Sequence, residues 1–450
     1  MTLSAGMSEL DTCVLRMTGT NYEIKVWDHL TLHSSFMVPC DELSFTISDE
    51  DQTLATELLV PGAPLQLTVN GKPQFTGYLD KKRTSVSRNG GTVITCSARD
   101  ILGPVINSNV APKIRFSGNE TLLDFVVAVL VPLGIKTIYN DGSLNVNLQT
   151  GAAQKPKLSS ASVSAQLPKA SLASDGSITN EFETVTATSK SNSAKTDLKT
   201  LKIKQLKPHD GEGAYQFVDR ILKRLGYRMW AAADGSGVII DKPDFTSKPT
   251  HTLIHSRTSE TTNIESAELH QDWESQPSCF VATGVGGTEA NLDRRSLAVV
   301  CINELVGTDA NGEPLQEIKN IIATYPGAVV LPLRKQLIPD RKGFAESLIA
   351  RPMFGKDKDA HTADQLAAFA RREMSARQHK AFQLKVTITG LSLDGVPFAP
   401  NTNVIVKDDV LGISKTLWVM EREFEKTREG TRTSITLVLP FTVDLTGSST

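Results

Sequence analysis

Two long stretches of the chain, one near its start and one at its end, alternate apolar with polar residues, and this pattern limits the possible folds most strongly. The first runs from Tyr22 to Leu102 and the second from Phe382 to Pro440. A period of two places successive side chains on opposite faces of a strand, so both stretches predict strands with one buried face. Asn70-Gly71 and Glu429-Gly430 separate such runs, as the turns of tight hairpins do. Both stretches therefore predict antiparallel meanders.

Hairpins within the two stretches also resemble each other. Near the start, FTGYLD, a turn and GGTVITCSARD are similar to LWVMEREFE, a turn and GTRTSITLVLP near the end. Internal duplication explains the likeness, but so does the ease with which any two hairpins look alike, because the lengths between the turns differ. The sequence leaves both explanations open.

Helical spacing interrupts the strand pattern in the middle of the chain. Apolar residues recur every three or four positions over 119–133, with Asn119 as the expected N-cap and Pro132 near the end. A second amphipathic helix is expected over 210–226, followed by a hairpin that turns at Asp234-Gly235. This part of the chain predicts a small α+β unit.

A third helix is predicted after residue 362. Thr362 and Gln365 have the spacing of a capping box. The face expected to be buried carries Leu366, Phe369, Ala370 and Met374.

Two segments show neither period. Ser, Thr, Ala and Lys dominate 158–200, so this stretch is expected to be an extended or mobile insertion, because it buries too little to offset the entropy of ordering. Residues 284–360 are rich in Gly, Pro and charge and give no secure assignment.

Together these patterns predict an α+β fold that is mainly β, with two antiparallel barrel-like β domains flanking a smaller α+β middle region. In chain order, we expect an N-terminal tail at 1–20, a first β-barrel domain at 21–106, an α+β middle domain at 107–157 and 201–250 that contains the Ser/Thr-rich insertion at 158–200, and a second β-barrel domain at 251–310 and 376–446 that contains an insertion with a helix at 311–375.

Composition and charge exclude several classes of protein. The 48 Lys and Arg residues nearly balance 50 Asp and Glu, so a net charge of -2 gives no chain-wide attraction to nucleic acid or to an anionic membrane. No run reaches the roughly 18 apolar residues of a membrane helix, and residues 1–12 lack the regions of a signal peptide. The cysteines form no Cys-x-x-Cys pair. We therefore expect a protein made and kept inside a cell, without membrane insertion or sequence-specific nucleic-acid binding. The five cysteines are Cys13, Cys40, Cys96, Cys279 and Cys301.

No group of residues predicts catalysis, a metal site or a cofactor. His29 and His33 have the H-x-x-x-H spacing, as do His251 and His255, but four residues of a strand span about 13 Å, too far for two imidazoles to hold one ion. His209-Asp210 precedes a helix, where Asp is expected as a cap rather than as an acid or base.

Four other runs have ordinary interpretations. GVGGT at 284–288 lacks the G-K-S/T ending of a phosphate loop and predicts a turn or bulge. The acidic run 48–51 lacks the ligand pattern of a calcium loop and predicts a solvated turn. Lys81-Lys82-Arg83 and Arg371-Arg372 are too short for a nucleic-acid stripe and indicate solvated faces or subunit contacts.

Several segments together resemble the baseplate hub family of contractile tails, the group of Mu-like tail proteins, late control protein D and the T-even hub. The C-terminal match is the most specific, because its pieces recur in a fixed order, whereas 158–200 and 311–361 depart from the family pattern. The N-terminal segments are Val26-Trp27-Asp28, LSFTISD, PGAPLQLTVNG, QFTGYLD and Ser97-Ala98-Arg99-Asp100; the middle ones are TLLDFVVAVLVPLGI and GEGAYQFVDRILKRLGYRMWAAADGSGVII; the C-terminal ones are ARREMSARQHKAFQLKVTITGL, DGVPFAPNTNVIVKDD and LWVMEREFEKTREGTRTSITLVLP.

The resemblance implies a structural subunit that is not an enzyme. Three chains, each with two similar barrels, would form a homotrimeric ring that joins a sixfold tail tube to a threefold spike. Implied partners are the central spike protein, a tail tube or tube-initiator protein and baseplate wedge proteins, in a virion baseplate assembled in the bacterial cytoplasm. The N-terminal tail and the edge hairpins near Asn70 and Gly430 are expected to contact neighbours. Expected interface residues are Trp27, Asn70, Arg99, Asp100, Asn401, Trp418 and Gly430.

Three alternatives remain. A hub or spike component of a type VI secretion system resembles the same family in its first half, but no β-helical needle sequence is present here. A cell-wall glycan hydrolase lacks support, since neither a lysozyme-like pair of carboxylates nor a zinc motif is recognisable. A sugar-binding adhesin is disfavoured by the aromatic content of 6%.

Overall fold

The structure is a computed structural model of the 450-residue chain. It describes residues 11–19, 22–25, 27–49, 59–88, 91–111, 114, 116, 122–140, 146–147, 152–153, 160–172, 178–190, 207–258, 262–272, 276–284, 297–303, 307–308, 313–325, 327–332, 350–357, 360 and 363–440.

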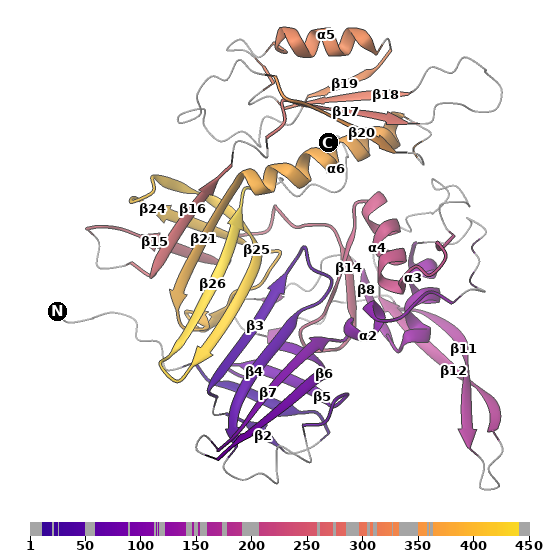
Figure 1. Cartoon of the computed structure of the whole chain (residues 1–450), viewed down its shortest axis with the longest axis vertical. Helices are drawn as coiled ribbons and strands as arrows, with labels where there is room; N and C mark the ends of the chain where they lie inside the picture. Colours follow the sequence, from indigo (N-terminus) through magenta and orange to yellow (C-terminus); the bar gives the residue numbers. More distant parts are fainter. Residues whose placement is uncertain are drawn as a thin grey trace.

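The largest element of the fold is a sheet of 13 strands that contains the strands of both alternating stretches (Figure 1). Its hydrogen-bonded order is β16-β21-β26-β25-β3-β4-β7-β6-β5-β1-β2, with β24 beside β25 and β15 beside β24. The N-terminal strands are β1 (Cys13–Met17), β2 (Glu23–Ile24), β3 (His29–Ser35), β4 (Glu42–Asp49), β5 (Pro64–Val69), β6 (Lys72–Ser87) and β7 (Gly91–Asp100). The C-terminal strands are β15 (His251–His255), β16 (Ser266–Gln271), β21 (Phe382–Thr389), β24 (Asn403–Asp408), β25 (Ile413–Thr427) and β26 (Thr431–Val438), with the short pair β22 (Ser392–Leu393) and β23 (Val396–Pro397) nearby in sequence.

The mainly β, α+β fold predicted from the sequence is confirmed, and the two β regions are joined edge to edge by pairing of β25 with β3. We name β3 to β7 the first β unit and β16, β21, β24, β25 and β26 the second β unit. Their strand orders correspond, β3-β4-β7-β6-β5 in the first and β16-β21-β26-β25-β24 in the second. Neither is the simple meander predicted, because β4 pairs with β7 rather than β5, and β21 pairs with β26 rather than β24. Each unit has an apolar core, and Phe424 of β25 enters the core of the first unit. The resemblance between the two hairpins therefore extends to all five strands of each unit.

Turn chemistry explains the first hairpin. Asn70 and Gly71 connect β5 to β6 with positive φ angles of 50° and 74°, as the predicted Asn-Gly turn requires.

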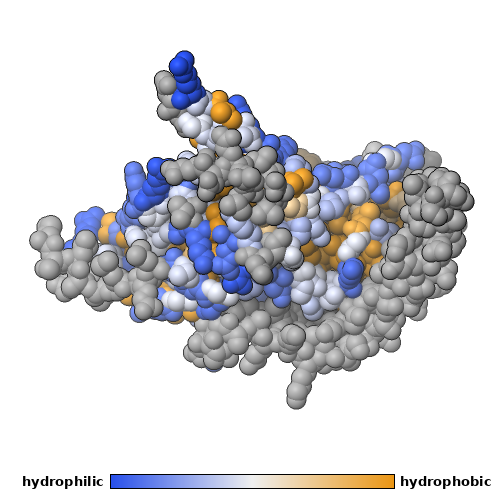
Figure 2. Space-filling model, turned by 90° about the horizontal axis from the view of Figure 1, so that it is seen from below, coloured by the Kyte–Doolittle hydropathy of each residue, from blue (hydrophilic) through white to orange (hydrophobic). Residues whose placement is uncertain are grey.

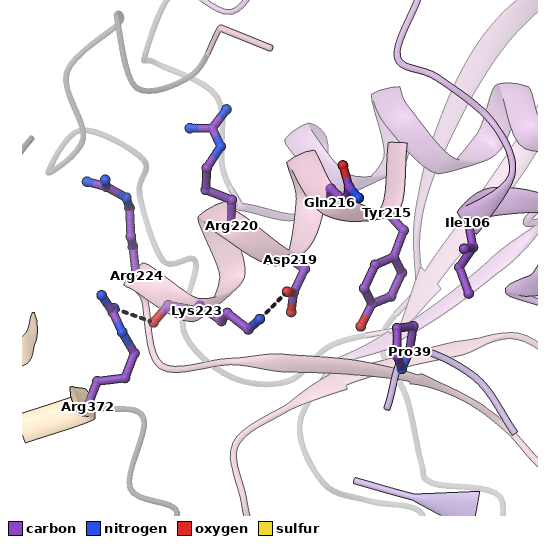
Figure 3. A pocket seen from close by; sticks show the side chains of 9 residues that line it. All are labelled: Pro39, Ile106, Tyr215, Gln216, Asp219, Arg220, Lys223, Arg224 and Arg372. Atoms are coloured by element: carbon purple, nitrogen blue, oxygen red, sulfur yellow. Dashed lines mark hydrogen bonds and ion pairs between the residues drawn. The ribbon is translucent and has the colours of Figure 1, made fainter. Parts of the chain in front are cut away.

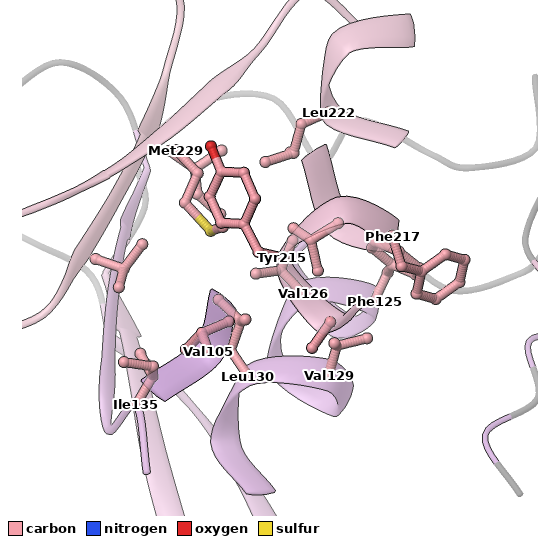
Figure 4. Close-up of a cluster of buried hydrophobic side chains, with 14 of the residues drawn as sticks. Val105, Phe125, Val126, Val129, Leu130, Ile135, Tyr215, Phe217, Leu222 and Met229 are labelled. Carbon is pink, nitrogen blue, oxygen red and sulfur yellow. The ribbon is translucent and has the colours of Figure 1, made fainter. Parts of the chain in front are cut away.

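The α+β region packs three helices and a short 3-10 turn against a five-stranded sheet of order β11-β12-β8-β14-β13. Apolar side chains of the helices interlock with those of the sheet, among them Phe125, Leu130, Phe217 and Met229 (Figure 4). The helices are α2 (Gly103–Ile106), α3 (Leu122–Leu130), η1 (Val131–Leu133) and α4 (Ala214–Arg224); the strands are β8 (Thr137–Asn140), β11 (Ser160–Leu172), β12 (Ile178–Lys190), β13 (Arg228–Ala231) and β14 (Val238–Asp241), with the separate pair β9 (Val146–Asn147) and β10 (Ala152–Ala153).

Helix ends agree with the sequence in part. Gly134 ends the first helix in the left-handed conformation, and Asn119 lies outside the described residues. The N-cap of α4 is Gly213 and not Asp210, because the chain turns at Gly211, with φ 75°, before the helix begins. The predicted Asp210 cap is therefore wrong.

The Ser/Thr-rich segment is more regular than its composition suggests. Strands β11 and β12 form a long antiparallel hairpin that extends away from the α+β region (Figure 1). Residues Thr188 to Lys190 of β12 pair in parallel with β8. Backbone hydrogen bonding along the ladder, which side-chain composition does not reveal, gives the extended form.

A separate sheet interrupts the second β unit between β16 and β21 and forms the upper part of the molecule (Figure 1). Helix α6 covers one of its faces and α5 the other, so that alternate residues of β17 enter two different cores. Leu366, Ala370 and Met374 of α6 are buried as predicted, and Phe369 is partly buried. The elements are β17 (Cys279–Gly284), β18 (Ala298–Ile302), α5 (Gln316–Thr324), β19 (Val329–Pro332), β20 (Pro352–Asp357) and α6 (Ala363–Ala381).

The predicted boundary at residue 310 differs from the boundary of this sheet. Strands β17 and β18 were assigned to the second β-barrel domain, but they pair with each other and with β20 and β19. All five residues of β18 are buried, as expected for a strand covered on both faces. Such a strand has no alternation that would separate it from a neighbouring sheet.

Candidate functional site

The junction between the two β units is the most elaborate polar site among the described residues. Residues Glu421 to Thr427 of β25 pair with Ser35 to His29 of β3. Beside this ladder Arg422 is 3% exposed, and its guanidinium donates hydrogen bonds to Ser34 Oγ (2.7 Å), Gln74 Oε1 (2.7 Å) and the Phe398 carbonyl oxygen (2.8 Å). One buried cation therefore connects β25, β3, β6 and the segment before β24.

Two carboxyl groups continue this network, that of Asp41, which is half-buried, and that of Asp100, which is buried. Ser34 Oγ donates to Asp41 Oδ2 at 2.8 Å, and the Asp41 backbone N–H donates to Asp100 Oδ2 at 2.8 Å. Burial raises the pKa of Asp41, against the opposing charge of Arg422. Burial and then the charge of Asp41 raise the pKa of Asp100 well above its usual range. Burial lowers the pKa of Arg422 to about 10, so it remains a cation at neutral pH.

A second polar cluster connects the start of the chain to both β units. Asp11 is 7% exposed and accepts hydrogen bonds from Asn70 Nδ2 (2.6 Å), Ser392 Oγ (2.7 Å) and the Leu391 backbone N–H (2.5 Å). Part of the predicted N-terminal tail is therefore a component of the sheet, because β1 follows Asp11 directly and pairs with β5. Residues 1–10 lie outside the described residues.

The predicted interface residues occupy different environments in the chain. Trp27 is 4% exposed and packs edge-on against Phe45, 5.6 Å away between ring centroids. Trp418 is fully buried and donates from Nε1 to Asn401 Oδ1 at 3.3 Å. The structure therefore brings two of the predicted residues, Trp418 and Asn401, into direct contact. Both tryptophans lie in the interior of the chain.

The remaining predicted residues lie nearer the surface, except for Asp100. Arg99 is half-buried, pairs with Asp80 and donates to Asn107 Oδ1. Asp100 is 4% exposed and caps the Leu102 backbone N–H. Gly430 is exposed in the turn between β25 and β26. A role of these residues in subunit contacts stays a prediction.

A cationic pocket of about 510 Å³ lies between α2, α4, α6 and the segment around Pro39 (Figure 3). Three of its basic side chains are paired within the chain: Arg220 with Glu212, Lys223 with Asp219 and Arg224 with Asp357. Arg372 donates to the Lys223 carbonyl oxygen at 3.4 Å. The pocket thus connects the α+β region to α6. Its lining is Pro39, Ile106, Tyr215, Gln216, Asp219, Arg220, Lys223, Arg224 and Arg372.

The histidine pairs lie on strands, as predicted. His29 and His33 are on β3, and His251 and His255 are on β15. His251 is buried and stacks on Phe398 at 4.0 Å. Within the described ranges, no three His, Cys, Asp or Glu side chains are placed to hold a metal ion.

Two further surface features concern possible partners. In the part of the chain that the structure describes, no helix is both long and apolar enough to cross a membrane. Seen from below, the coloured surface is largely hydrophilic, and its broadest hydrophobic area lies at the right of the view (Figure 2).

Sequence reasoning missed Arg422 and its carboxyl neighbours. The run EREFE suggests charged residues facing solvent, but a bulge between Val419 and Glu421 changes which residues face inward. Arg422 and Phe424 consequently lie on the buried side.

The fold of this chain is that of known tail proteins, as the sequence resemblance predicted. No family model matches the sequence, and no curated protein matches it. The structure is similar to that of a tail protein from Neisseria meningitidis MC58, with a TM-score of 0.62 and 20% identity over 97% of this chain and 99% of that one. It is also similar to the 43 kDa tail protein of prophage MuSo2 from Shewanella oneidensis, with a TM-score of 0.61 and 16% identity over 96% of this chain and 99% of that one.

Proposed function

We propose that this chain is a structural, non-enzymatic baseplate hub subunit of a contractile phage tail. In this proposal three copies form a ring that joins the sixfold tail tube to the threefold central spike and surrounds the DNA passage. Similarity to two tail proteins over nearly the whole length of both chains supports the fold on which the proposal rests.

One observation supports the ring above all others. The chain contains two β units with the same strand order, joined through β25 and β3. Three copies would present six similar units, which suits a sixfold tube, while the inserted and α+β regions, present once per chain, would keep threefold symmetry for a spike. A near-neutral net charge of -2 is compatible with DNA passing through the ring without strong attraction.

The partners in this proposal are the spike protein, a tube or tube-initiator protein and baseplate wedge proteins. The location is the virion baseplate, after assembly in the bacterial cytoplasm. The exposed turn at Gly430 and the hairpin turn at Asn70 lie at ends of strands, where a stacked neighbour would meet the ring.

Light scattering of the purified protein at several concentrations tests the ring. The proposal expects a species of three times the 48.8 kDa chain mass, which then binds the spike and tube proteins of the same tail. A chain that stays monomeric, both alone and with those proteins, would contradict it. Release of glycan fragments from purified cell wall would instead identify a hydrolase.

A further inference from the structure

The two β units match residue by residue at one irregularity. The register of β6 against β7 shifts between Leu79 and Lys81, and that of β25 against β26 shifts between Val419 and Glu421. When the two bulges are superimposed, Lys81 corresponds to Glu421 and each later residue of β6 to one of β25.

The same alignment extends through the neighbouring strands. β24 then corresponds to β5, β26 to β7, β21 to β4 and β16 to β3. Pairing is maintained at each step except near the Asn70 turn, where the register of β5 against β6 shifts between Leu67 and Thr68 and that of β24 against β25 does not. In particular, Ser266 lies opposite Thr387 as His29 lies opposite Thr46. Apart from that shift, the two units are equivalent in register as well as in order.

The equivalent of the β25–β3 pairing is not found at β6 among the described strands. β25 pairs with β24 through its first half and with β3 through Glu421 to Thr427. β6 likewise pairs with β5 through its first half, but along Lys81 to Ser87 the described part of the chain provides a partner strand on only one side, β7. Most of these side chains are exposed, and Val86 is 71% exposed.

The counterpart of β3 lies at the far end of the same sheet. Strand β16 ends the hydrogen-bonded order and, among the described strands, pairs with β21 alone. Glu268 and His270 of β16 are exposed. The chain thus forms one β25–β3 junction and carries both halves of a second junction at opposite ends of the sheet.

We propose that β16 of a second copy of this chain pairs antiparallel with Lys81 to Ser87 of β6, in the register that β3 has on β25. This deepens the proposed ring and rests on it only for the number of copies. Ser85 would then lie opposite Glu268 of the second copy, as Glu425 lies opposite Thr31 within the chain. Arg83 would lie opposite His270 of the second copy, as Glu423 lies opposite His33.

Charge complementarity supports this occupant. In the proposed register Lys81 lies opposite Asp272 of the second copy, and Arg83 lies on the same face between Asp272 and Glu268. Opposite charges across an antiparallel pair contribute about 0.2–1 kcal/mol each. On the other face, the exposed Val86 meets Ala267 of the second copy. A basic strand edge therefore meets an acidic one.

The two surfaces are different, so each copy can bind one neighbour at each end. Such contacts continue until a ring closes, or else produce a filament. Because each chain contributes two matching units, a closed ring holds an even number of them. Junctions within a chain would alternate with junctions between chains.

Disulfide cross-linking tests the register directly. The variant Ser85→Cys with Glu268→Cys should form covalent dimers and larger oligomers on oxidation, seen on non-reducing gels. Background should be low because all five native cysteines are buried, and burial raises the pKa of the Cys13 and Cys96 thiols to about 11.

Two matched variants control the experiment. Thr31→Cys with Glu425→Cys lies at the equivalent junction within the chain, so it should form a disulfide in the monomer without oligomers. Ser85→Cys with His270→Cys is displaced by two residues and should cross-link far less. Arg83→Glu should weaken self-association about five-fold, and added Glu268→Arg should restore it.

The outcomes separate this inference from the proposed function. The inference is overturned, and the ring is not, if wild type has the mass of a ring but the Ser85→Cys, Glu268→Cys variant forms no cross-link. The same holds if the Ser85→Cys, His270→Cys variant cross-links as strongly. A wild-type chain that stays monomeric and gives no cross-link overturns the inference, because the pairing is proposed to need no other partner. It overturns the ring as well when the chain also stays monomeric with the spike and tube proteins.

Discussion

Arg422 on β25 donates a 2.7 Å hydrogen bond to Gln74 on β6, although three strands lie between β25 and β6 in the order of the sheet. Neighbouring strands are about 4.8 Å apart, so a flat sheet would separate these two by about 19 Å. The sheet must therefore curl to bring them together. The bond fixes the two β units relative to each other.

Replacing Arg422 should destabilise the protein strongly. In Arg422→Met, Ser34, Gln74 and the Phe398 carbonyl lose a shared donor, and Asp41 loses its countercharge. We expect a loss of about 3–5 kcal/mol in the free energy of unfolding, measured by urea denaturation at fixed protein concentration.

Arg428→Met is the matched control for this variant. The Arg428 side chain is 72% exposed and pairs with Asp28, so its loss should cost less than about 1 kcal/mol. Equal costs for the two arginines would show that the buried network does not stabilise the junction.

The carboxyl pair should give the junction a distinctive pH dependence. Burial, and for Asp100 also the charge of Asp41, raises both pKa values in the folded state. The folded protein then holds more protons than the unfolded chain above about pH 3.9, so these groups lower stability as the pH rises from there. The stability of wild type minus that of Asp41→Asn should therefore fall between pH 4 and 7.

Asp28→Asn should show the opposite sign. Burial alone would raise the pKa of Asp28, but hydrogen bonds from Ser48 and Arg428 lower it overall. Its contribution is present above the unfolded pKa and disappears as the pH falls through the folded value. Denaturation curves collected across pH 2 to 7 would reveal both trends, and parallel curves for the two variants would refute the assignment.

Gly77→Ala should disrupt the β6–β7 ladder. A Cβ atom at Gly77 would lie 2.0 Å from the Arg99 carbonyl oxygen, so the backbone must shift. Overpacking of this kind costs about 1–3 kcal/mol. At Gly213 the nearest atom would be 3.5 Å away, and Gly213→Ala should leave the thermal midpoint nearly unchanged. Similar midpoints for both variants would count against this close approach.

Asp11→Ala should loosen the contact between the Asn70 turn and the Leu391-Ser392 segment. Three donors lose their acceptor, for an expected cost of about 1–3 kcal/mol. Thr12→Ala removes a longer, exposed hydrogen bond and serves as the control.

Removal of residues 1–10, which leaves Asp11 and β1 in place, tests the predicted tail contacts by its effect on oligomer mass. An unchanged mass would contradict those contacts.

Local sequence patterns predicted the parts of the fold that depend on neighbours in the chain. Alternation identified the strands but not their order, and Asn70-Gly71 identified a turn whose backbone has the positive φ angles expected there. The pairing of β3 with β25 has no local signal, because either strand edge is compatible with the same alternation. The same limit explains β18, whose two buried faces leave no alternation to read.

The candidate site was less predictable than the fold. Resemblance selected Trp27 and Trp418, but it does not distinguish a residue that packs inside one chain from one that contacts another. Arg422 was not predicted, because the extra residue at the bulge reverses which face of β25 each later residue occupies. Lys81-Lys82-Arg83 suggested subunit contacts among other options, and the register of the second unit is needed to propose which strand they meet.

The chain leaves the large sheet after β16 and returns at β21, where the Asp272 backbone N–H donates to the Ala381 carbonyl oxygen at 3.0 Å. The inserted segment between them, which includes α5 and α6, is therefore attached to the sheet at two adjacent residues, Asp272 and Ala381. In the first unit the equivalent connection runs only from Ser35 to Glu42. The ends of the insert are thus already held together, and loop-closure entropy depends weakly on what they carry. The inserted segment can therefore change in length and structure without a change in how the sheet is built.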